Sequence, residues 1–295
     1  MGDKSAIEWT DATWNPVTGC SKVSPGCDNC YAIRETNRHR NLPNYAGLTK
    51  KVVSWNTRTT LDWTGEVRCH PELLDLPLRW KTPRRIFVCS MSDLFHDKVP
   101  WEFLCQVFDM MALARQHTFQ VLTKRPGRMA YFAEKVWPRY GRGTPSMYMG
   151  EWPPNVWAGT SVESQRYAPR LDCLARVPAR VRFVSVEPML GPVDLQNWLG
   201  CDAEDRDCLQ WVICGGESGP GARPMHPEWA RSLRDQCQRA GVPFFFKQNG
   251  EYVSVSEVAG PGTHFQFADG ATVRRTGKTL AGALLDGREW REWPA

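Results

Sequence analysis

The chain has 295 residues, of which 42% are hydrophobic and 23% charged, so a buried core is expected and global disorder is excluded. The 37 Lys and Arg outnumber the 32 Asp and Glu by five, which permits an anionic partner without requiring one. No apolar run approaches the ~18 residues of a membrane span, and the start lacks the apolar stretch of a secretory signal, so we expect a cytoplasmic protein.

The eleven cysteines of a chain without an export signal should be reduced, and they then serve as core residues, metal ligands or reactive thiols. The fourteen tryptophans often fall outside a regular apolar pattern, which predicts that some are exposed or line a cleft.

The most informative segment follows a weak predicted strand at Trp14–Thr18. It carries Cys20, Cys27 and Cys30 in a C-x6-C-x2-C spacing. Three thiolates are one short of a closed zinc site, and a [4Fe–4S] cluster held by three cysteines keeps one iron open for a small molecule. Two alternatives remain: a structural zinc with a distant fourth ligand such as Cys69 or His70, or cysteines that bind no metal.

Residues 38–65 form a long insertion, followed by a second weak strand at Glu66–Cys69. Six Lys or Arg and one acidic residue lie between Arg34 and Arg58, with Tyr45 and Trp55 among them. This mixture suits phosphate contacts and base stacking in a nucleic-acid groove, and it suits a solvated basic surface equally well.

Short apolar runs then alternate with helical patterns. The predicted strands are Arg85–Cys89, Phe119–Leu122, Val156–Ala158, Val181–Val186, Gln210–Cys214 and Pro243–Phe246. The predicted helices are Trp101–Gln116, Arg128–Trp137, Gln165–Arg176 and Pro227–Ala240, the last of them stopped by Gly241. Such alternation predicts a full or partial parallel (β/α) barrel over residues 1–250, with 251–295 as a small C-terminal appendix.

Polar or small residues follow each strand, where a parallel barrel places its chemistry. They are Ser90 to Asp93, Thr123 to Arg125, Gly159 to Ser161, Glu187 to Met189 and Gly215 to Ser218. Glu187 and Glu217 are candidate acid–base residues or ligand contacts, or else structural carboxylates paired with arginine. Lys247 and Gln248 are weaker candidates. Cys201 and Cys208 suggest a weak second metal site.

The three-cysteine loop, with Tyr31 directly after its last cysteine, resembles the radical S-adenosylmethionine (SAM) superfamily, although the first gap is longer than the common C-x3-C-x2-C. The whole chain resembles a family of such three-cysteine proteins that phages often encode. Ser92-Asp93, Thr123-Lys124 and Ser161 also resemble, in the same order, residues that line the SAM pocket of spore photoproduct lyase and its relatives.

This resemblance implies that Cys20, Cys27 and Cys30 bind a [4Fe–4S] cluster whose open iron chelates SAM. Tyr31 would then pack near the adenine, Ser92 and Asp93 would hydrogen-bond the ribose or the ammonium, and Lys124 would neutralise the carboxylate. Ser161 would complete the pocket. Reduction by an electron-donor protein would give a 5′-deoxyadenosyl radical, acting on DNA or a modified nucleobase.

Two departures bear on this reading. The superfamily's Gly-Gly-Glu has a counterpart in Gly215-Gly216-Glu217, but it comes too late in the chain to carry the same role. Met91 occupies the place of the lyase's hydrogen-donating cysteine, which makes repair of a thymine photoproduct by the same route doubtful. A non-enzymatic protein stabilised by zinc or a cluster, which binds nucleic acid, is the alternative from another class.

Overall fold

The computed structural model describes residues 5–53, 59–140, 150–200 and 208–295. Trp55, Arg58 and Cys201, which the sequence singles out, lie outside these residues. The chain forms two compact units. Unit 1 comprises Met1–Gly159 and Arg176–Arg180, and unit 2 comprises Thr160–Ala175 and Val181–Ala295.

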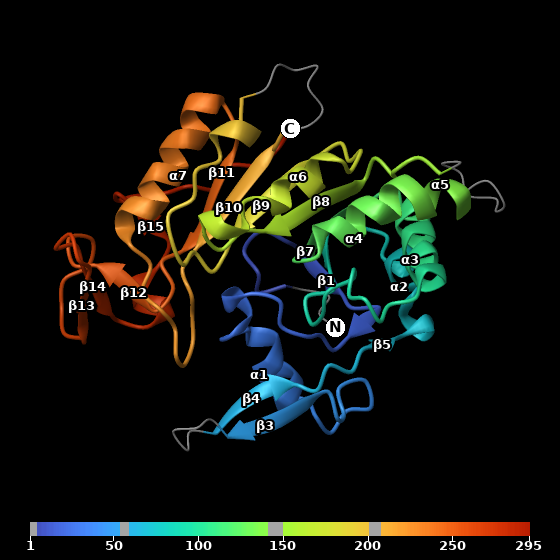
Figure 1. Cartoon of the computed structure of the whole chain (residues 1–295), viewed down its shortest axis with the longest axis horizontal. Helices are drawn as coiled ribbons and strands as arrows, with labels where there is room; N and C mark the ends of the chain where they lie inside the picture. Colours follow the sequence, from blue (N-terminus) through green and yellow to red (C-terminus); the bar gives the residue numbers. More distant parts are fainter. Residues whose placement is uncertain (1–4, 54–58, 141–149, 201–207) are drawn as a thin grey trace. The chain divides into compact units, whose positions relative to one another are not determined.

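The main sheet has seven parallel strands in the order β1-β6-β7-β8-β9-β10-β11, so the fold is a partial parallel (β/α) barrel, as predicted (Figure 1). Its strands are β1 (Ala12–Trp14), β6 (Arg85–Val88), β7 (Thr118–Thr123), β8 (Val156–Ser161), β9 (Arg182–Val186), β10 (Trp211–Gly215) and β11 (Phe244–Gln248). The six strong predicted strands all belong to it, because their continuous runs of branched and aromatic residues suit a sheet covered on both faces.

The two weak predicted strands are wrong in extent and partner. The run Trp14–Thr18 is split, since Pro16 has no N–H to donate to a ladder. Its first part ends β1, and its second part, β2 (Val17–Thr18), pairs antiparallel with β5 (Arg68–Cys69) in a separate small sheet.

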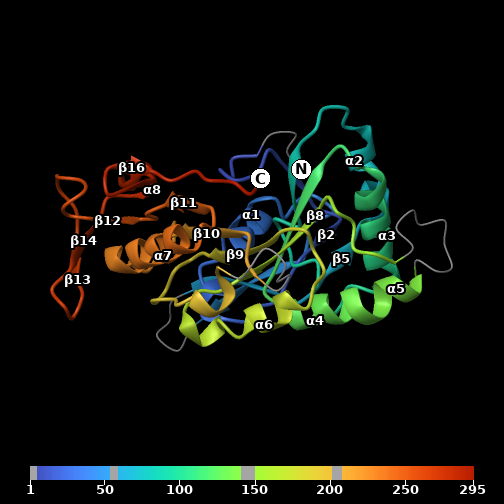
Figure 2. The ribbon, with the colours of Figure 1, turned by 90° about the horizontal axis from the view of Figure 1, so that it is seen from above.

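The helices α3 (Trp101–Leu113) and α7 (Pro227–Ala240) match the predictions, and Gly241 ends α7 with a φ of 65°. Figure 2 shows α7 running along β10 and β11, against which it packs. The predicted helix at 165–176 is broken into η4 (Gln165–Tyr167) and α6 (Arg170–Ala175), because Pro169 has no N–H to donate to the preceding turn.

The remaining helical elements are short. They are η1 (Pro25–Cys27), α1 (Tyr31–Arg38), η2 (Pro71–Leu73), α2 (Leu76–Arg79), α4 (Pro126–Tyr131), the π-helical η3 (Phe132–Val136), α5 (Trp137–Tyr140), η5 (Gln196–Trp198) and α8 (Lys278–Ala281). Together α4, η3 and α5 form one continuous helical stretch where the sequence predicts a helix over 128–137.

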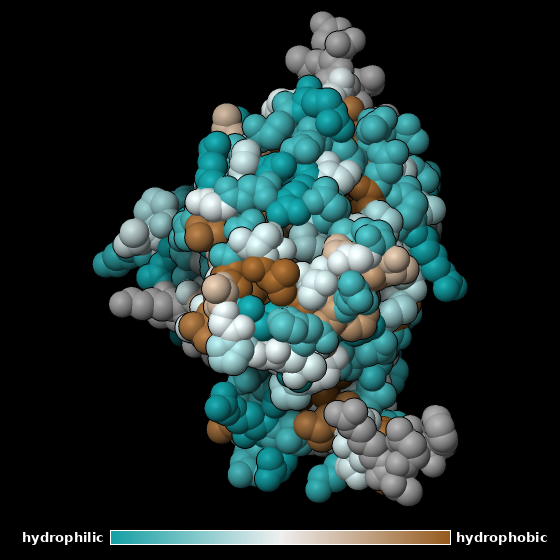
Figure 3. Space-filling model, turned by 90° about the vertical axis from the view of Figure 1, so that its left-hand side faces the viewer, coloured by the Kyte–Doolittle hydropathy of each residue, from teal (hydrophilic) through white to brown (hydrophobic). Residues whose placement is uncertain are grey.

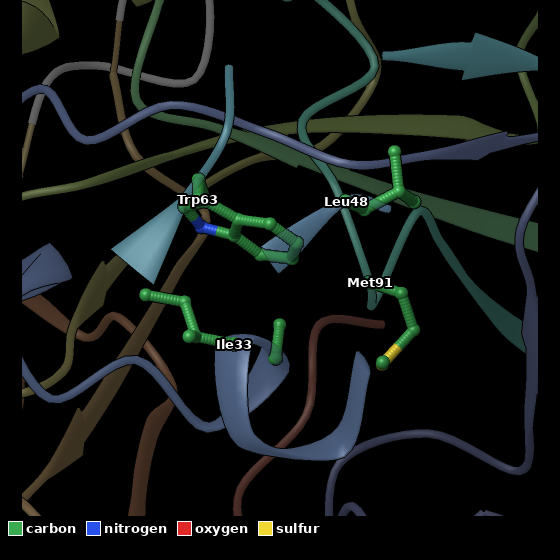
Figure 4. Packing of buried hydrophobic residues seen from close by; sticks show 5 residues of the cluster. Ile33, Leu48, Trp63 and Met91 are labelled. Atoms are coloured by element: carbon green, nitrogen blue, oxygen red, sulfur yellow. The ribbon is translucent and has the colours of Figure 1, made fainter. Parts of the chain in front are cut away.

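The insertion at 38–65 contains a hairpin of β3 (Thr49–Val53) and β4 (Thr59–Trp63), which packs against α1. Figure 4 shows how Ile33, Leu48, Trp63 and Met91 come together in one apolar cluster. Cys20 and Cys30 pack against the same cluster. The insertion therefore supplies part of the apolar cluster against which the cysteine loop packs.

Residues 251–295 form two small sheets within unit 2. One is β12 (Tyr252–Ser254), β14 (Thr272–Arg275) and β13 (His264–Gln266), and the other is β15 (Leu284–Leu285) with β16 (Arg288–Glu289). Leu280 and Leu284 are exposed in this segment. Figure 3 shows a face that is largely hydrophilic with small hydrophobic patches. Among the described residues, no helix is long and apolar enough to cross a membrane.

Two expectations from composition need correction. No described tryptophan is exposed, and Trp14, Trp137 and Trp211 are among the largest fully buried side chains, so these rings build the cores of the units. Cys208 is disulfide-bonded, so the expectation that every cysteine is reduced fails there. Cys208 is consequently no thiolate ligand for a second metal site.

Asp109 on α3 gives a pH-dependent test of this packing. Burial raises the pKa of its carboxyl, against the opposing hydrogen bond that Tyr140 donates to it at 3.0 Å. A carboxyl with a higher pKa in the folded chain holds its proton more tightly there, so stability falls as pH rises from the unfolded pKa through the folded one. The Asp109→Asn variant should therefore melt at a higher temperature than the natural chain at pH 7. The difference should vanish below the unfolded pKa of about 4. Melting curves across pH 3–8 that stay parallel would contradict this.

Candidate functional site

Three loops meet at the carboxyl ends of the neighbouring strands β1, β6 and β7 in unit 1. The loop that carries Cys20, Cys27 and Cys30, called the cysteine loop below, follows β1, and the loop Ser90 to Asp93 follows β6. Thr123 is the last residue of β7, and Lys124 and Arg125 follow it. A bridge joins Gly19 to Ser92, and the Ser92 hydroxyl donates to the carbonyl of Val17 at 2.8 Å. The topology thus brings together three of the segments that the sequence singles out.

The three cysteines of the loop are free, half-buried thiols. Burial raises the pKa of Cys20 to about 12, with the charges of Asp93 and Cys30 adding to the rise and that of Arg125 opposing it. Burial also raises the pKa of Cys30, where Cys27 adds to the rise and Lys124 opposes it. Each of Cys20 and Cys27 therefore lies within electrostatic reach of Cys30.

Two cations from one dipeptide flank these thiols. Arg125 places Nη1 3.9 Å from the Cys20 Sγ, and the charge of Lys124 acts on Cys30. Positive charge near a thiol favours the thiolate, which is the form that binds a metal. The resemblance implies that Lys124 contacts a bound carboxylate, and in the structure its charge also acts on Cys30. Arg125 is not among the predicted site residues, although it lies in one of the predicted loops.

Asp93 is buried and accepts four hydrogen bonds. Its Oδ1 accepts from the Thr123 hydroxyl at 2.7 Å and from the Phe95 N–H at 3.0 Å. Its Oδ2 accepts from the Lys124 N–H at 3.1 Å and from Arg125 Nη1 at 2.9 Å. Both oxygens are thus fully used within the protein. Asp93 therefore holds the loop after β7 in place and orients the Arg125 side chain.

Arg125 also hydrogen-bonds the cysteine loop. Its Nη2 donates to the Ser21 carbonyl at 3.1 Å and to the Ser21 hydroxyl at 2.9 Å. The same hydroxyl lies 2.8 Å from His96 Nε2. The side chains of the ion pair formed by Arg125 and Asp93 are only 10% and 8% exposed. The hydrogen bonds from Arg125 to Asp93 and to Ser21 therefore hold the start of the cysteine loop in place.

Tyr31 begins α1 and is exposed, with its hydroxyl donating to the Ser90 carbonyl at 2.6 Å. Ser90 and Met91 are in turn held by the Asn15 Oδ1, which accepts from the Ser90 hydroxyl and the Met91 N–H, each at 3.1 Å. The ring predicted to pack near adenine therefore lies beside the loop after β6.

Of the two suggested fourth ligands, His70 has other side-chain partners and Cys69 is a free thiol. His70 has Nε2 2.8 Å from the Thr18 hydroxyl and Nδ1 3.2 Å from Glu72. Cys69 lies opposite Val17 in the β2–β5 pair, and its charge adds to the rise that burial causes in the pKa of Cys89. Over the described ranges, no group of three or more His, Cys, Asp or Glu side chains is arranged to hold a metal ion.

Unit 2 carries the other predicted site residues at the carboxyl ends of β8 to β11. Glu187 Oε1 lies 2.7 Å from Lys247 Nζ, and both side chains are largely buried. Gly215 lies between them on β10, where an added Cβ would be 3.4 Å from each side chain. The ion pair therefore passes over Gly215 on the middle strand, from the end of β9 to β11.

A buried thiol and a buried amide lie close to this pair. Burial raises the pKa of Cys214, and the charges of Glu187 and of Cys237 on α7 add to the rise. Gln248, directly after Lys247, is 4% exposed, and its Oε1 has no hydrogen-bond partner among the residues described. The structure thus joins Glu187 and Lys247, which the sequence proposes separately, and it adds a buried amide.

Glu217 matches the structural alternative that the sequence leaves open. Its two oxygens accept from Arg223 Nη2 at 2.5 Å and Nε at 2.8 Å, and from the Arg223 N–H at 2.8 Å. Ser161 is buried at the end of β8, and its carbonyl accepts from Arg170, which also pairs with the fully buried Glu163. Glu217 and Ser161 are thus both held by hydrogen bonds from arginines of unit 2.

Gly215 and Gly216 offer a matched pair of substitutions. A Cβ at Gly216 would overlap the backbone carbonyl of Asn249, whereas one at Gly215 would make ordinary contacts. Gly216→Ala should lower the free energy of unfolding by about 1–3 kcal/mol or more, and Gly215→Ala by clearly less. Urea unfolding of both variants checks this, and equal losses would show that the close approach at Gly216 is not a constraint.

Comparison with known proteins gave three findings. A family model described as "Protein of unknown function (DUF5131)" matches residues 4–294. No curated protein matches the chain. Among solved structures, a mutant of spore photoproduct lyase is similar over 93% of this chain and 71% of its own, with 11% identity and a TM-score of 0.42. A spore photoproduct lyase complexed with dinucleoside spore photoproduct is similar over 88% and 66%, with 9% identity and a TM-score of 0.36.

Proposed function

The chain belongs to the DUF5131 family, and from its own site we propose that it is a radical SAM enzyme that binds one [4Fe–4S] cluster through Cys20, Cys27 and Cys30. The observation that carries the proposal is the position of the three-cysteine loop. It follows the first strand of a partial parallel barrel, and the polar loops after the next two strands pack beside it.

The donor set fits such a cluster in its chemistry. Three free thiols share one loop, and soft thiolates are the ligands that iron–sulfur clusters take. The raised pKa of Cys20 and Cys30 keeps those thiols protonated near neutral pH, so binding a cluster releases their protons. Arg125 and Lys124 supply positive charge beside the thiolates that form.

When bound, the cluster with SAM supplies one-electron chemistry that yields a 5′-deoxyadenosyl radical. The chain's own residues bind and orient. Arg125 and Ser21 fix the start of the loop, and Asp93 holds Arg125. Tyr31 lies beside Ser90, where we propose that it packs against the adenine. Ser92, Lys124 and Ser161 complete the proposed SAM contacts. Glu187 is the proposed acid–base residue, whereas Glu217 is paired with Arg223.

We further propose that the substrate is a nucleic acid or a nucleobase. Arg38, Arg40, Lys50 and Lys51 are exposed on α1, the segment after it and β3 in unit 1. Such residues suit phosphate contacts, which weaken steeply with salt. Binding to single-stranded and duplex DNA is expected at low salt and should fall as salt rises. A folded protein that binds neither at low salt would remove this part of the proposal.

The alternative is a non-enzymatic protein in which zinc or a cluster staples the loop and the surface binds nucleic acid. Anaerobic purification separates the two. The enzyme should be brown, contain about four irons per chain, and cleave SAM to 5′-deoxyadenosine and methionine under reduction. A colourless protein with about one zinc and no SAM cleavage would favour the alternative.

A further inference from the structure

A cavity in unit 1 lies outside the proposed SAM contacts. Its volume is about 280 Å³. It is lined by Asn15, Thr18, Leu42, Pro43, Asn44, Tyr45 and Leu73. At about 30 Å³ per water molecule it has room for roughly nine waters, which is near the lower end of small-ligand pockets.

Asn15 gives the cavity a fixed donor. Its side-chain oxygen accepts from the Ser90 hydroxyl and the Met91 N–H, and these two bonds determine which way the amide is turned. The amide nitrogen has no partner among the described residues, although Asn15 is only 3% exposed. This nitrogen is not among the buried side-chain atoms that lack a partner in the described part of the chain, so it is open to solvent and can donate to a ligand that replaces water.

The rest of the lining restricts the ligand further. Leu42, Pro43 and Leu73 are apolar, and the Tyr45 ring offers a flat surface that also lies near the His39 ring. The Thr18 hydroxyl is already used by the Asn44 carbonyl and His70. None of the seven lining residues is charged, so the lining offers no counter-ion to a charged ligand.

We propose that this cavity binds a neutral nitrogen heterocycle of the nucleobase type, with a ring nitrogen or carbonyl acceptor hydrogen-bonded to the Asn15 amide and the ring faces against Tyr45 and Leu73. The site contains none of the three cysteines, so its occupancy does not depend on cluster binding or on SAM cleavage. The heterocycle arrives either as a free base or as a base of a nucleic-acid strand.

Ligand-detected NMR on the full chain, with adenine and thymine as probes, tests the proposal. Asn15→Asp keeps the oxygen that Ser90 and Met91 require and replaces the donor by an acceptor, so it should weaken binding at least tenfold. Leu73→Trp fills the cavity from a different residue and should have the same effect. Leu78→Trp, at an exposed position on α2, should bind as the natural chain does.

A comparison among probes shows which features of the ligand the cavity recognises. Adenine should bind more tightly than indole, which has the ring but no acceptor, and more tightly than adenosine monophosphate, whose phosphate is charged. Tighter binding of oligodeoxyadenylate than of adenine would show that a strand presents the base, and the reverse would show a free base. The proposal is overturned if neither base binds the folded protein, if indole binds as well as adenine, or if Leu73→Trp leaves binding unchanged.

Discussion

The Cys27→Ser variant is expected to take up almost no iron on anaerobic reconstitution, whereas the natural chain takes up about four atoms per protein. Two thiolates do not hold a cubane, and no other cysteine belongs to the loop. Cys27 is the best position for the test because it ends the short η1, whereas Cys20 and Cys30 pack against the apolar cluster of Ile33 and Trp63 and contribute to folding. Iron and sulfide analysis with the visible spectrum measures the result.

Cys69→Ser is the matched control. Cys69 is also a half-buried free thiol in unit 1, and it is one of the two fourth ligands, with His70, that the zinc alternative suggests. A cluster with an open iron predicts that this variant keeps its full iron content. If Cys69→Ser lost its metal as completely as Cys27→Ser, a four-ligand site would replace the three-ligand one.

The Asp93→Ala variant should lose about 3–5 kcal/mol of unfolding free energy, because it leaves the Arg125 guanidinium buried without its counter-ion. It also removes the acceptor for Thr123, Phe95 and the Lys124 N–H. Since Arg125 holds Ser21, the start of the cysteine loop should loosen as well. Urea unfolding measures the stability, and alkylation of Cys20 by a small thiol reagent measures the loosening.

Asp75→Ala provides the comparison. Asp75 pairs with Arg79 at 2.7 Å, but both side chains are more than half exposed, so its loss should change stability by less than about 1 kcal/mol. Similar losses in the two variants would show that the buried Asp93–Arg125 pair does not organise this region.

The sequence predicts the main sheet well because its strands are short apolar runs bounded by polar or small residues. It fails where tertiary pairing decides. β2 and β5 have two residues each, and nothing in Val17–Thr18 or Arg68–Cys69 alone indicates that they pair with each other. The hairpin within 38–65 is not predicted either, because four of the five residues of β3 are exposed and form no alternating apolar pattern. The break in the helix at 165–176 is readable from the sequence, since Pro169 lies within it.

The site is predictable in its parts and less so in its connections. The residue types and their positions after strands are local features, so Cys20, Asp93 and Glu187 are found from the sequence. Their partners are not, because Arg125 lies 32 residues from Asp93 and Lys247 lies 60 from Glu187. One signal is available for Arg125, namely two adjacent cations directly after a buried strand.

The most direct test of the account is the electron paramagnetic resonance spectrum of the reduced, reconstituted protein with and without SAM. A cluster held by Cys20, Cys27 and Cys30 keeps one iron free, so adding SAM should shift the signal of the reduced cluster. A spectrum that SAM leaves unchanged, in a protein with its full iron content, would contradict the account.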